Sequence, residues 1–154
     1  MNGQFISAAG TYYVMSQLAM NEIHASCTFG NAPNIDVLAS SVDGAKSIAI
    51  QVKSSEYARR WRGRGGEEIV DHLEWDLGRN AAKKSLENLF FAFVDLEGDD
   101  DYPNVYIIPS NFIYDFCKKW VDEVSRVRFH PSVVEVEQFK DNWALLKNAL
   151  TKEK

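Results

Sequence analysis

The sequence contains few of the residues that build disulfide frameworks or zinc sites. It has only two cysteines, Cys27 and Cys117, and three histidines, and neither type recurs at a metal-ligand spacing. These absences argue against a zinc protein and against a fold held by disulfides. We expect both cysteines to be buried thiols in a reducing compartment.

Long hydrophobic runs are also absent. No segment approaches the ~18 consecutive apolar residues of a membrane span, and no apolar run flanked by Lys or Arg stands near the N-terminus. The sequence therefore predicts a cytoplasmic protein without membrane contact. Its 154 residues, 45% of them hydrophobic and 25% charged, favour a single globular domain over residues 1–154.

The charges are unevenly distributed. Seventeen Lys and Arg against 22 Asp and Glu give a net charge of −5, which argues mildly against a generic nucleic-acid binder. However, residues 53–64 are strongly basic and residues 95–101 carry acids without a base. One end of the domain is therefore expected to be basic although the whole chain is acidic.

Hydrophobic periodicity and turn residues predict an α/β order of elements. Residues 35–41 and 46–54 are expected to form an antiparallel hairpin around an Asp43-Gly44 turn. Residues 55–68 are expected to be a loop or a mobile arm, and residues 97–101 a solvated acidic loop. Other strands are expected at 23–29, 69–77, 89–96 and 104–108, and helices at 5–22, 80–87, 110 to about 124 and about 136 to 150.

The second hairpin strand carries the most informative pattern. Alternation along a strand places Ile48, Ile50 and Val52 on one face and Ala49, Gln51 and Lys53 on the other. The partner strand brings Asp36 close to the same edge. A carboxylate and an amide oxygen are hard ligands that suit Mg²⁺ (or Mn²⁺), and a lysine beside them can stabilise charge on a phosphate.

Structural explanations also exist for these residues. Asp36 can cap a turn after the preceding proline. Gln51 and Lys53 can be the solvated face of an ordinary strand.

These residues resemble a known family. Its motif corresponds here to Pro33-Asn34-Ile35-Asp36 followed by Ile50-Gln51-Val52-Lys53, which resembles the PD-(D/E)XK (restriction-endonuclease-like) nuclease superfamily in its variant with Gln in place of the acid. The segments 10–14 and 91–96 also resemble a subgroup of small stand-alone bacterial members. The resemblance implies an α/β restriction-endonuclease-like core, with a mixed central sheet flanked by helices. It also implies metal-dependent phosphodiester hydrolysis by Asp36, Gln51 and Lys53, with the metal on Asp36 and Gln51.

One position departs from the family pattern. Members often carry Glu after the glycine of the first helix, where it completes the metal shell, and this sequence has Thr11 there. Glu22 shares a face with Thr11 but lies about 16 Å further along a helix, so it cannot replace that Glu.

The basic segment suggests a second functional feature. Its arginines can contact phosphates while a tryptophan stacks on a base, or the segment is a solvated loop whose tryptophan packs on the domain. The candidate nucleic-acid-binding residues are Arg59, Arg60, Trp61, Arg62 and Arg64.

Two main hypotheses follow. The first is a Mg²⁺-dependent nuclease acting on DNA, which by analogy with enzymes that cut two strands would be a homodimer. The alternative is a catalytically inactive nucleic-acid- or protein-binding module on the same fold. A third class, an interaction or immunity-type protein, would use the acidic loop and the C-terminal helices.

Overall fold

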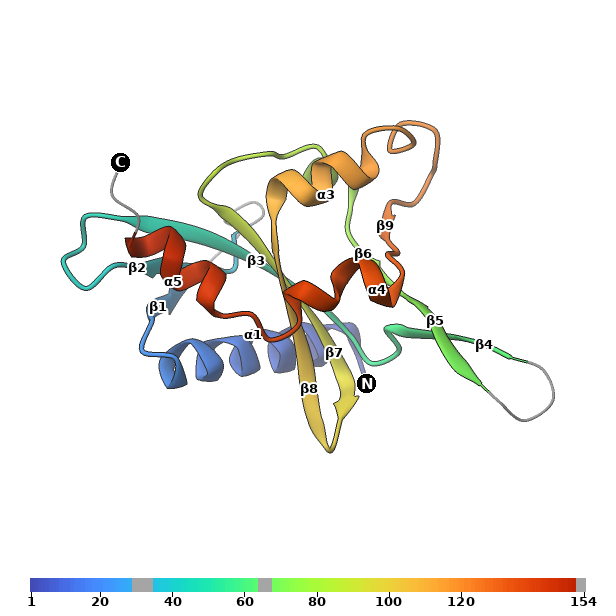
Figure 1. Cartoon of the computed structure of the whole chain (residues 1–154), viewed down its shortest axis with the longest axis horizontal. Helices are drawn as coiled ribbons and strands as arrows, with labels where there is room; N and C mark the ends of the chain where they lie inside the picture. The colour runs from blue at the N-terminus through green and yellow to red at the C-terminus, as the bar shows by residue number, and fades with distance from the viewer. Residues whose placement is uncertain (29–34, 64–67, 152–154) are drawn as a thin grey trace.

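The computed structural model describes residues 1–28, 35–63 and 68–151. Its helices and strands follow one another along the chain as Figure 1 shows. They are α1 (Gly3–Met20), β1 (His24–Cys27), β2 (Val37–Ser40), β3 (Ser47–Ser55), β4 (Arg59–Arg62), β5 (Ile69–Leu73), β6 (Trp75–Asp76), α2 (Arg79–Ala82), β7 (Leu89–Asp99), β8 (Tyr102–Pro109), α3 (Ser110–Cys117), β9 (Arg128–Phe129), α4 (Val133–Val136), η1 (Glu137–Phe139) and α5 (Ala144–Thr151).

The centre of the fold is a five-stranded mixed sheet in the order β1-β2-β3-β7-β8. Only β3 and β7 run parallel, and the other neighbours are antiparallel. The predicted hairpin is present, with Val37 opposite Ile50 and Ser40 opposite Ser47, and Gly44 takes the positive φ of 71° that its turn requires. The expected mixed sheet with flanking helices is therefore confirmed.

The alternation of side chains along the strands sorts the core into two layers. Ile48, Ile50 and Val52 of β3 join the cluster under α1 and α5. Phe91 and Phe93 of β7 point the other way, into the cluster beneath α3 that also contains Trp75. Because both faces are covered, β7 is a continuous apolar run. Five large aromatic side chains of these layers are buried, namely Phe90, Phe91, Phe93, Trp75 and Trp143.

Helix α1 lies directly on β3. A Cβ added at Gly10 would stand 1.7 Å from Ser54 Oγ and 2.7 Å from Ser54 Cβ, so only glycine permits this approach. The contact fixes the first helix against the strand that carries Gln51 and Lys53. No helix among the described residues is long and apolar enough to cross a membrane.

The basic segment differs from its prediction as a loop. Residues 59–62 form β4, which pairs antiparallel with β5 in a hairpin that projects from the body (Figure 1). The predicted strand 69–77 is divided at Glu74 into β5 and β6, because β6 leaves the hairpin to pair with β9. The acidic run is also more ordered than predicted, since β7 extends to Asp99 and the turn occupies Asp100 and Asp101.

Helix α1 has the 18 residues that the sequence predicts, two positions earlier, but the other helices are shorter than predicted. Helix α3 ends at Cys117, and Ser110 does not cap it, because its hydroxyl donates to Leu86 O and accepts from Leu86 N. The C-terminal helix is divided into α4, η1 and α5. The break lies at Asp141, which has a φ of 49° and bonds Val105 through both backbone and carboxylate. Cys117 is buried as expected, but Cys27 on the edge strand β1 is only half-buried.

Candidate functional site

Asp36 stands where β2 begins and is anchored to β3. Its backbone N–H donates to Ile50 O at 3.0 Å, and its Oδ2 accepts from Val52 N at 2.7 Å. The carboxylate thus satisfies a backbone donor at the open end of the β2–β3 ladder. This is a structural role, of the general kind that the capping interpretation expects. It also fixes Asp36 beside the segment that contains Gln51 and Lys53, while Oδ1 accepts no hydrogen bond from the described residues.

Gln51 is the unusual member of the group. Its side chain is 5% exposed, and its Oε1 is buried without a hydrogen-bond partner among the described residues. Burying a carbonyl oxygen without a partner costs about 1–3 kcal/mol. Gln51 is therefore not the solvated strand residue of the structural interpretation. A donor or a cation next to Oε1 would offset that cost.

Lys53 follows two residues later on the same strand and is half-buried. Burial lowers the pKa of its ammonium from the ordinary 10.5, while the charges of Asp36 and Asp76 act in the opposite direction. Within the described residues no carboxylate lies within 4.0 Å of its Nζ. Lys53 is therefore a partly desolvated cation near two carboxylates but paired with neither.

Asp76 was not identified from the sequence. It lies on β6, which contacts β3, and its charge acts on Lys53. Its carboxylate is paired with Arg126 and lies 3.5 Å from the Arg128 guanidinium. The sequence gives no signal for Asp76, because its position depends on the pairing of β6 with β9, and two-residue strands leave no recognisable pattern.

The residues present fit a hard cation with few protein ligands. Gln51 Oε1 and Asp36 Oδ1 are oxygen atoms without partners among the described residues, which is the donor chemistry that Mg²⁺ accepts together with waters. In the described part of the chain no group of three or more His, Cys, Asp or Glu could hold a metal. Thr11, half-buried on α1, adds no carboxylate.

The basic segment does not act as one unit. Arg59 is largely buried, and its guanidinium binds Asp95 at 2.9 Å, Asp99 at 2.7 Å and the carbonyl of Gly98. Its hydrogen-bonding edges are thus engaged in fastening β4 to β7. Arg60 and Arg62 keep exposed guanidinium groups and Trp61 is 52% exposed, whereas Arg64 lies outside the described residues.

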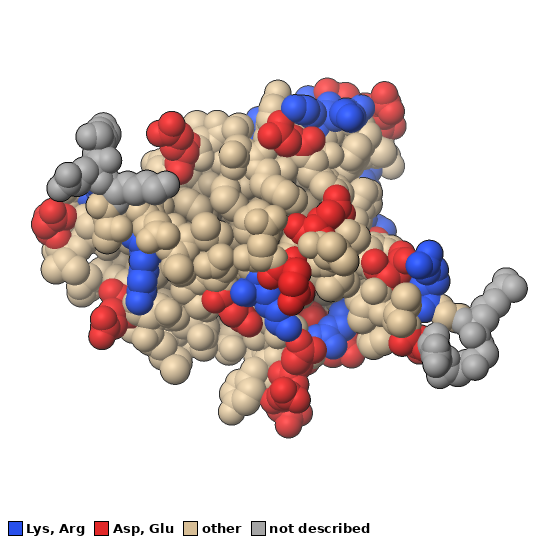
Figure 2. Space-filling view, viewed as in Figure 1, with Lys and Arg blue, Asp and Glu red and all other residues tan. Residues whose placement is uncertain are grey.

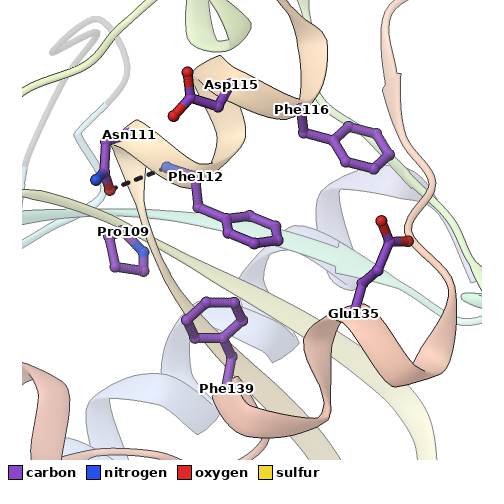
Figure 3. Close-up of a pocket in the computed structure, with 7 residues that line it drawn as sticks. All are labelled: Pro109, Asn111, Phe112, Asp115, Phe116, Glu135 and Phe139. Carbon is purple, nitrogen blue, oxygen red and sulfur yellow. Dashed lines mark hydrogen bonds between the residues drawn. The ribbon is translucent and has the colours of Figure 1, made fainter.

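A separate pocket of about 430 Å³ lies between α3 and the α4–η1 segment. Figure 3 shows Phe112, Phe116 and Phe139 on its walls, with Asp115 and Glu135 at its edge. It shares no residue with the group around Asp36. Glu135 is engaged with Ser132 in a capping box and Asp115 is paired with Lys118, so both carboxylates already have partners.

Comparisons with known proteins support the fold. No protein-family model and no curated protein matches the chain. Among solved structures, the chain is similar to a bacterial homing endonuclease, I-Ssp6803I, with a TM-score of 0.60 over 94% of this chain and 91% of that chain. The two sequences are only 11% identical, so the likeness concerns the fold. It agrees with the nuclease-like α/β architecture expected from the sequence.

Proposed function

We propose that this nuclease-like fold belongs to a metal-dependent nuclease of the PD-(D/E)XK type that hydrolyses phosphodiester bonds of DNA. Asp36 and Gln51 would hold Mg²⁺, and Lys53 would contact the scissile phosphate. The observation that carries the proposal is the buried Gln51 Oε1 beside the half-buried Lys53, since neither has a partner within the described part of the chain. Such incompletely satisfied polar groups are typical of sites that await a ligand.

Each residue has a distinct task in this mechanism. Asp36 and Gln51 would hold the Mg²⁺, and the chemistry it would supply is polarisation of the phosphate and activation of the attacking water. Asp36 is held in place by Val52 N, so its free oxygen is oriented before a ligand arrives. Lys53 donates a hydrogen bond to a phosphate oxygen and stabilises the charge that develops there.

The test is a cleavage assay on single-stranded, duplex and branched DNA with Mg²⁺ or Mn²⁺. Asp36→Asn is the informative variant, because its amide oxygen can still accept from Val52 N while the negative charge is lost. We expect metal-dependent cutting by the wild-type protein and none by Asp36→Asn, with similar unfolding midpoints. Cutting by the variant at the wild-type rate would contradict the assignment.

A catalytically inactive binding module is the second candidate. Thr11 and the neutral Gln51 favour it, because they leave Asp36 as the one carboxylate predicted to bind the metal. A Mn²⁺ titration separates the two functions. The nuclease predicts binding that Asp36→Asn abolishes, whereas the inactive module predicts none. Failure of the wild-type protein both to bind Mn²⁺ and to cut any of the three substrates would favour the module.

A further inference from the structure

Four arginines from two distant segments of the chain are paired with three carboxylates, those of Asp71, Glu74 and Asp76. Two of them, Arg60 and Arg62, come from β4, and two, Arg126 and Arg128, come from the segment that enters β9. Figure 2 shows basic and acidic side chains interspersed at the end of the molecule that carries the β4–β5 hairpin. We call these four residues the arginine row.

The centre of the row is held by one carboxylate. Glu74 Oε1 accepts from Arg60 at 3.0 Å and from Arg128 at 2.9 Å, so the two guanidinium groups converge on a single oxygen. The Glu74 side chain is 16% exposed, whereas those of Arg60 and Arg128 are 43% and 40% exposed. The acid therefore lies beneath the two cations and orients their outer N–H groups toward solvent.

Each end of the row is held in the same way. Arg62 pairs with Asp71 at 3.1 Å near the outer part of the hairpin. At the inner end, Arg126 binds Asp76 through two nitrogens, and Arg128 lies 3.5 Å from the same carboxylate. Asp76 lies on β6, which contacts β3, the strand that carries Lys53. The row therefore runs from the projecting hairpin to the neighbourhood of Lys53.

The dimensions of the row suit a polyanionic strand. The chain from Ile69, opposite Arg62, to Asp76, opposite Arg128, passes a register shift and the break at Glu74, so it spans at most about 23 Å at ~3.3 Å per residue. That length corresponds to about two-thirds of a turn of duplex DNA. Guanidinium groups fixed on one side by carboxylates keep planar donor pairs for phosphate oxygens on the other.

We propose that the arginine row is the track that binds DNA phosphates next to the Lys53 site, with Arg126 and Arg128 as DNA-binding residues. This proposal rests on the proposed nuclease function. It adds to the DNA-contact surface two residues from the C-terminal third of the sequence, Arg126 and Arg128. It also leaves Arg59 outside that surface, because the Arg59 side chain is only 16% exposed and is bound to Asp95 and Asp99.

The experiment measures binding without catalysis. A fluorescently labelled 20-base-pair duplex and its single strand are titrated by anisotropy in EDTA at several salt concentrations between 50 and 200 mM. The plot of log K against log salt has a negative slope, and each lost phosphate contact reduces the magnitude of that slope by ~0.9 for duplex and ~0.7 for single strands. We therefore expect R126Q and R128Q each to reduce the duplex slope by about 0.9.

Three controls make the result specific. K46Q and K147Q remove the same charge from the β2–β3 turn and from α5, at the other end of the molecule (Figure 1), and should leave the slope unchanged. R126K keeps the charge and should retain most of the slope. Arg126 and Asp76 are both exposed, so R126Q should fold normally even if R128Q is destabilised through the loss of its bond to Glu74.

The outcomes separate this proposal from the one on which it rests. If the wild-type protein binds and cuts DNA but R126Q and R128Q keep the wild-type slope, the track is wrong and the nuclease stands. If R126Q and K147Q reduce the slope equally, the effect comes from net charge and the track is also wrong. If the wild-type protein neither binds nor cuts DNA, both proposals fail.

Discussion

Two groups of polar and charged side chains lie close together on the central sheet and differ in how completely their members are paired. One is the Asp95–Asp99 cluster, which we define as Asp95, Asp99, Arg59 and Lys140. The other is the candidate site of Asp36, Gln51 and Lys53. The parallel register of β3 and β7 sets Lys53 beside Phe93 and Ser55 beside Asp95, so the two groups occupy adjacent levels of the same strand pair.

The cluster is saturated with partners. Asp95 is fully buried and bonded to Arg59, and Asp99 accepts from Arg59, Asn104 and Lys140 at distances between 2.6 and 2.9 Å. The candidate site has one anchored carboxylate and two groups without partners among the described residues. Paired charges fasten one element to another, whereas unpaired groups keep their capacity for a ligand.

The largest effect is expected in the cluster. Arg59→Ala should lower the free energy of unfolding by about 3–5 kcal/mol, because it leaves the buried Asp95 carboxylate uncompensated. Arg62→Ala is the matched control, since Arg62 is 74% exposed and its pair should contribute at most about 1 kcal/mol. Urea unfolding measures both variants. If both variants lose the same free energy of unfolding, the buried Arg59–Asp95 pair stabilises the fold no more than the exposed Arg62 pair does.

A smaller effect, opposite in direction for stability and for activity, is expected at Lys53. Lys53→Met should reduce cleavage by about 10²- to 10³-fold, as loss of a transition-state donor does, and should slightly raise stability. Burial lowers the pKa of Lys53, so the unfolded chain binds more protons between the lowered pKa and 10.5. Wild-type stability should therefore rise with pH through that window, and Lys53→Met should lack this rise.

The measurement is the urea midpoint of both proteins at a series of pH values from neutral to alkaline. Arg60→Met serves as a control, because it removes a cation from β4 without touching β3. If Lys53→Met is markedly less stable than the wild-type protein, Lys53 has a structural partner and resembles the cluster.

The smallest effect concerns acid stability. Hydrogen bonds from Lys140, Asn104 and Arg59 hold the pKa of Asp99 well below its ordinary 3.8. The stabilisation that Asp99 supplies is thus present above that pH and is lost as the pH falls toward the depressed pKa. Asp99→Asn should unfold with a shallower dependence on pH below about 4. Circular dichroism during acid titration measures it, and an unchanged acid limb would mean that Asp99 is not coupled to folding.

The sequence was sufficient for the elements whose signals are local. Alternating apolar residues and the Asp43-Gly44 turn predicted the β2–β3 hairpin, and the apolar run predicted β7. The β4 strand was missed because Arg-rich residues carry no apolar alternation. It is held by the ion pair of its Arg59 with Asp95 of β7, a contact that only the tertiary fold provides. The engagement of Ser110 with Leu86 at the start of α3 and the break at Asp141 have similar long-range causes.

The same distinction applies to the candidate site. Asp36, Gln51 and Lys53 were predicted to converge because one local hairpin carries them. The hydrogen bond from Val52 N to the Asp36 carboxylate confirms that the two strands meet at this point. Their chemical roles remain a prediction. Asp76 could not be placed near Lys53, nor Arg126 beside Asp76, from the sequence, since β6 and β9 are two-residue strands from distant segments.

The parallel pairing of β3 with β7 has a kinetic consequence. The β2–β3 and β7–β8 hairpins close short loops. The pairing of β3 with β7 instead closes a long loop that contains β4, β5, β6 and α2. Non-local parallel pairing of this kind is slow to form. We expect the hairpin of Asp36 and Lys53 to assemble early and the Arg59–Asp95 bond to form at a late, rate-limiting step. Until then the apolar edge of β7 is exposed to other chains, which makes refolding yield dependent on protein concentration.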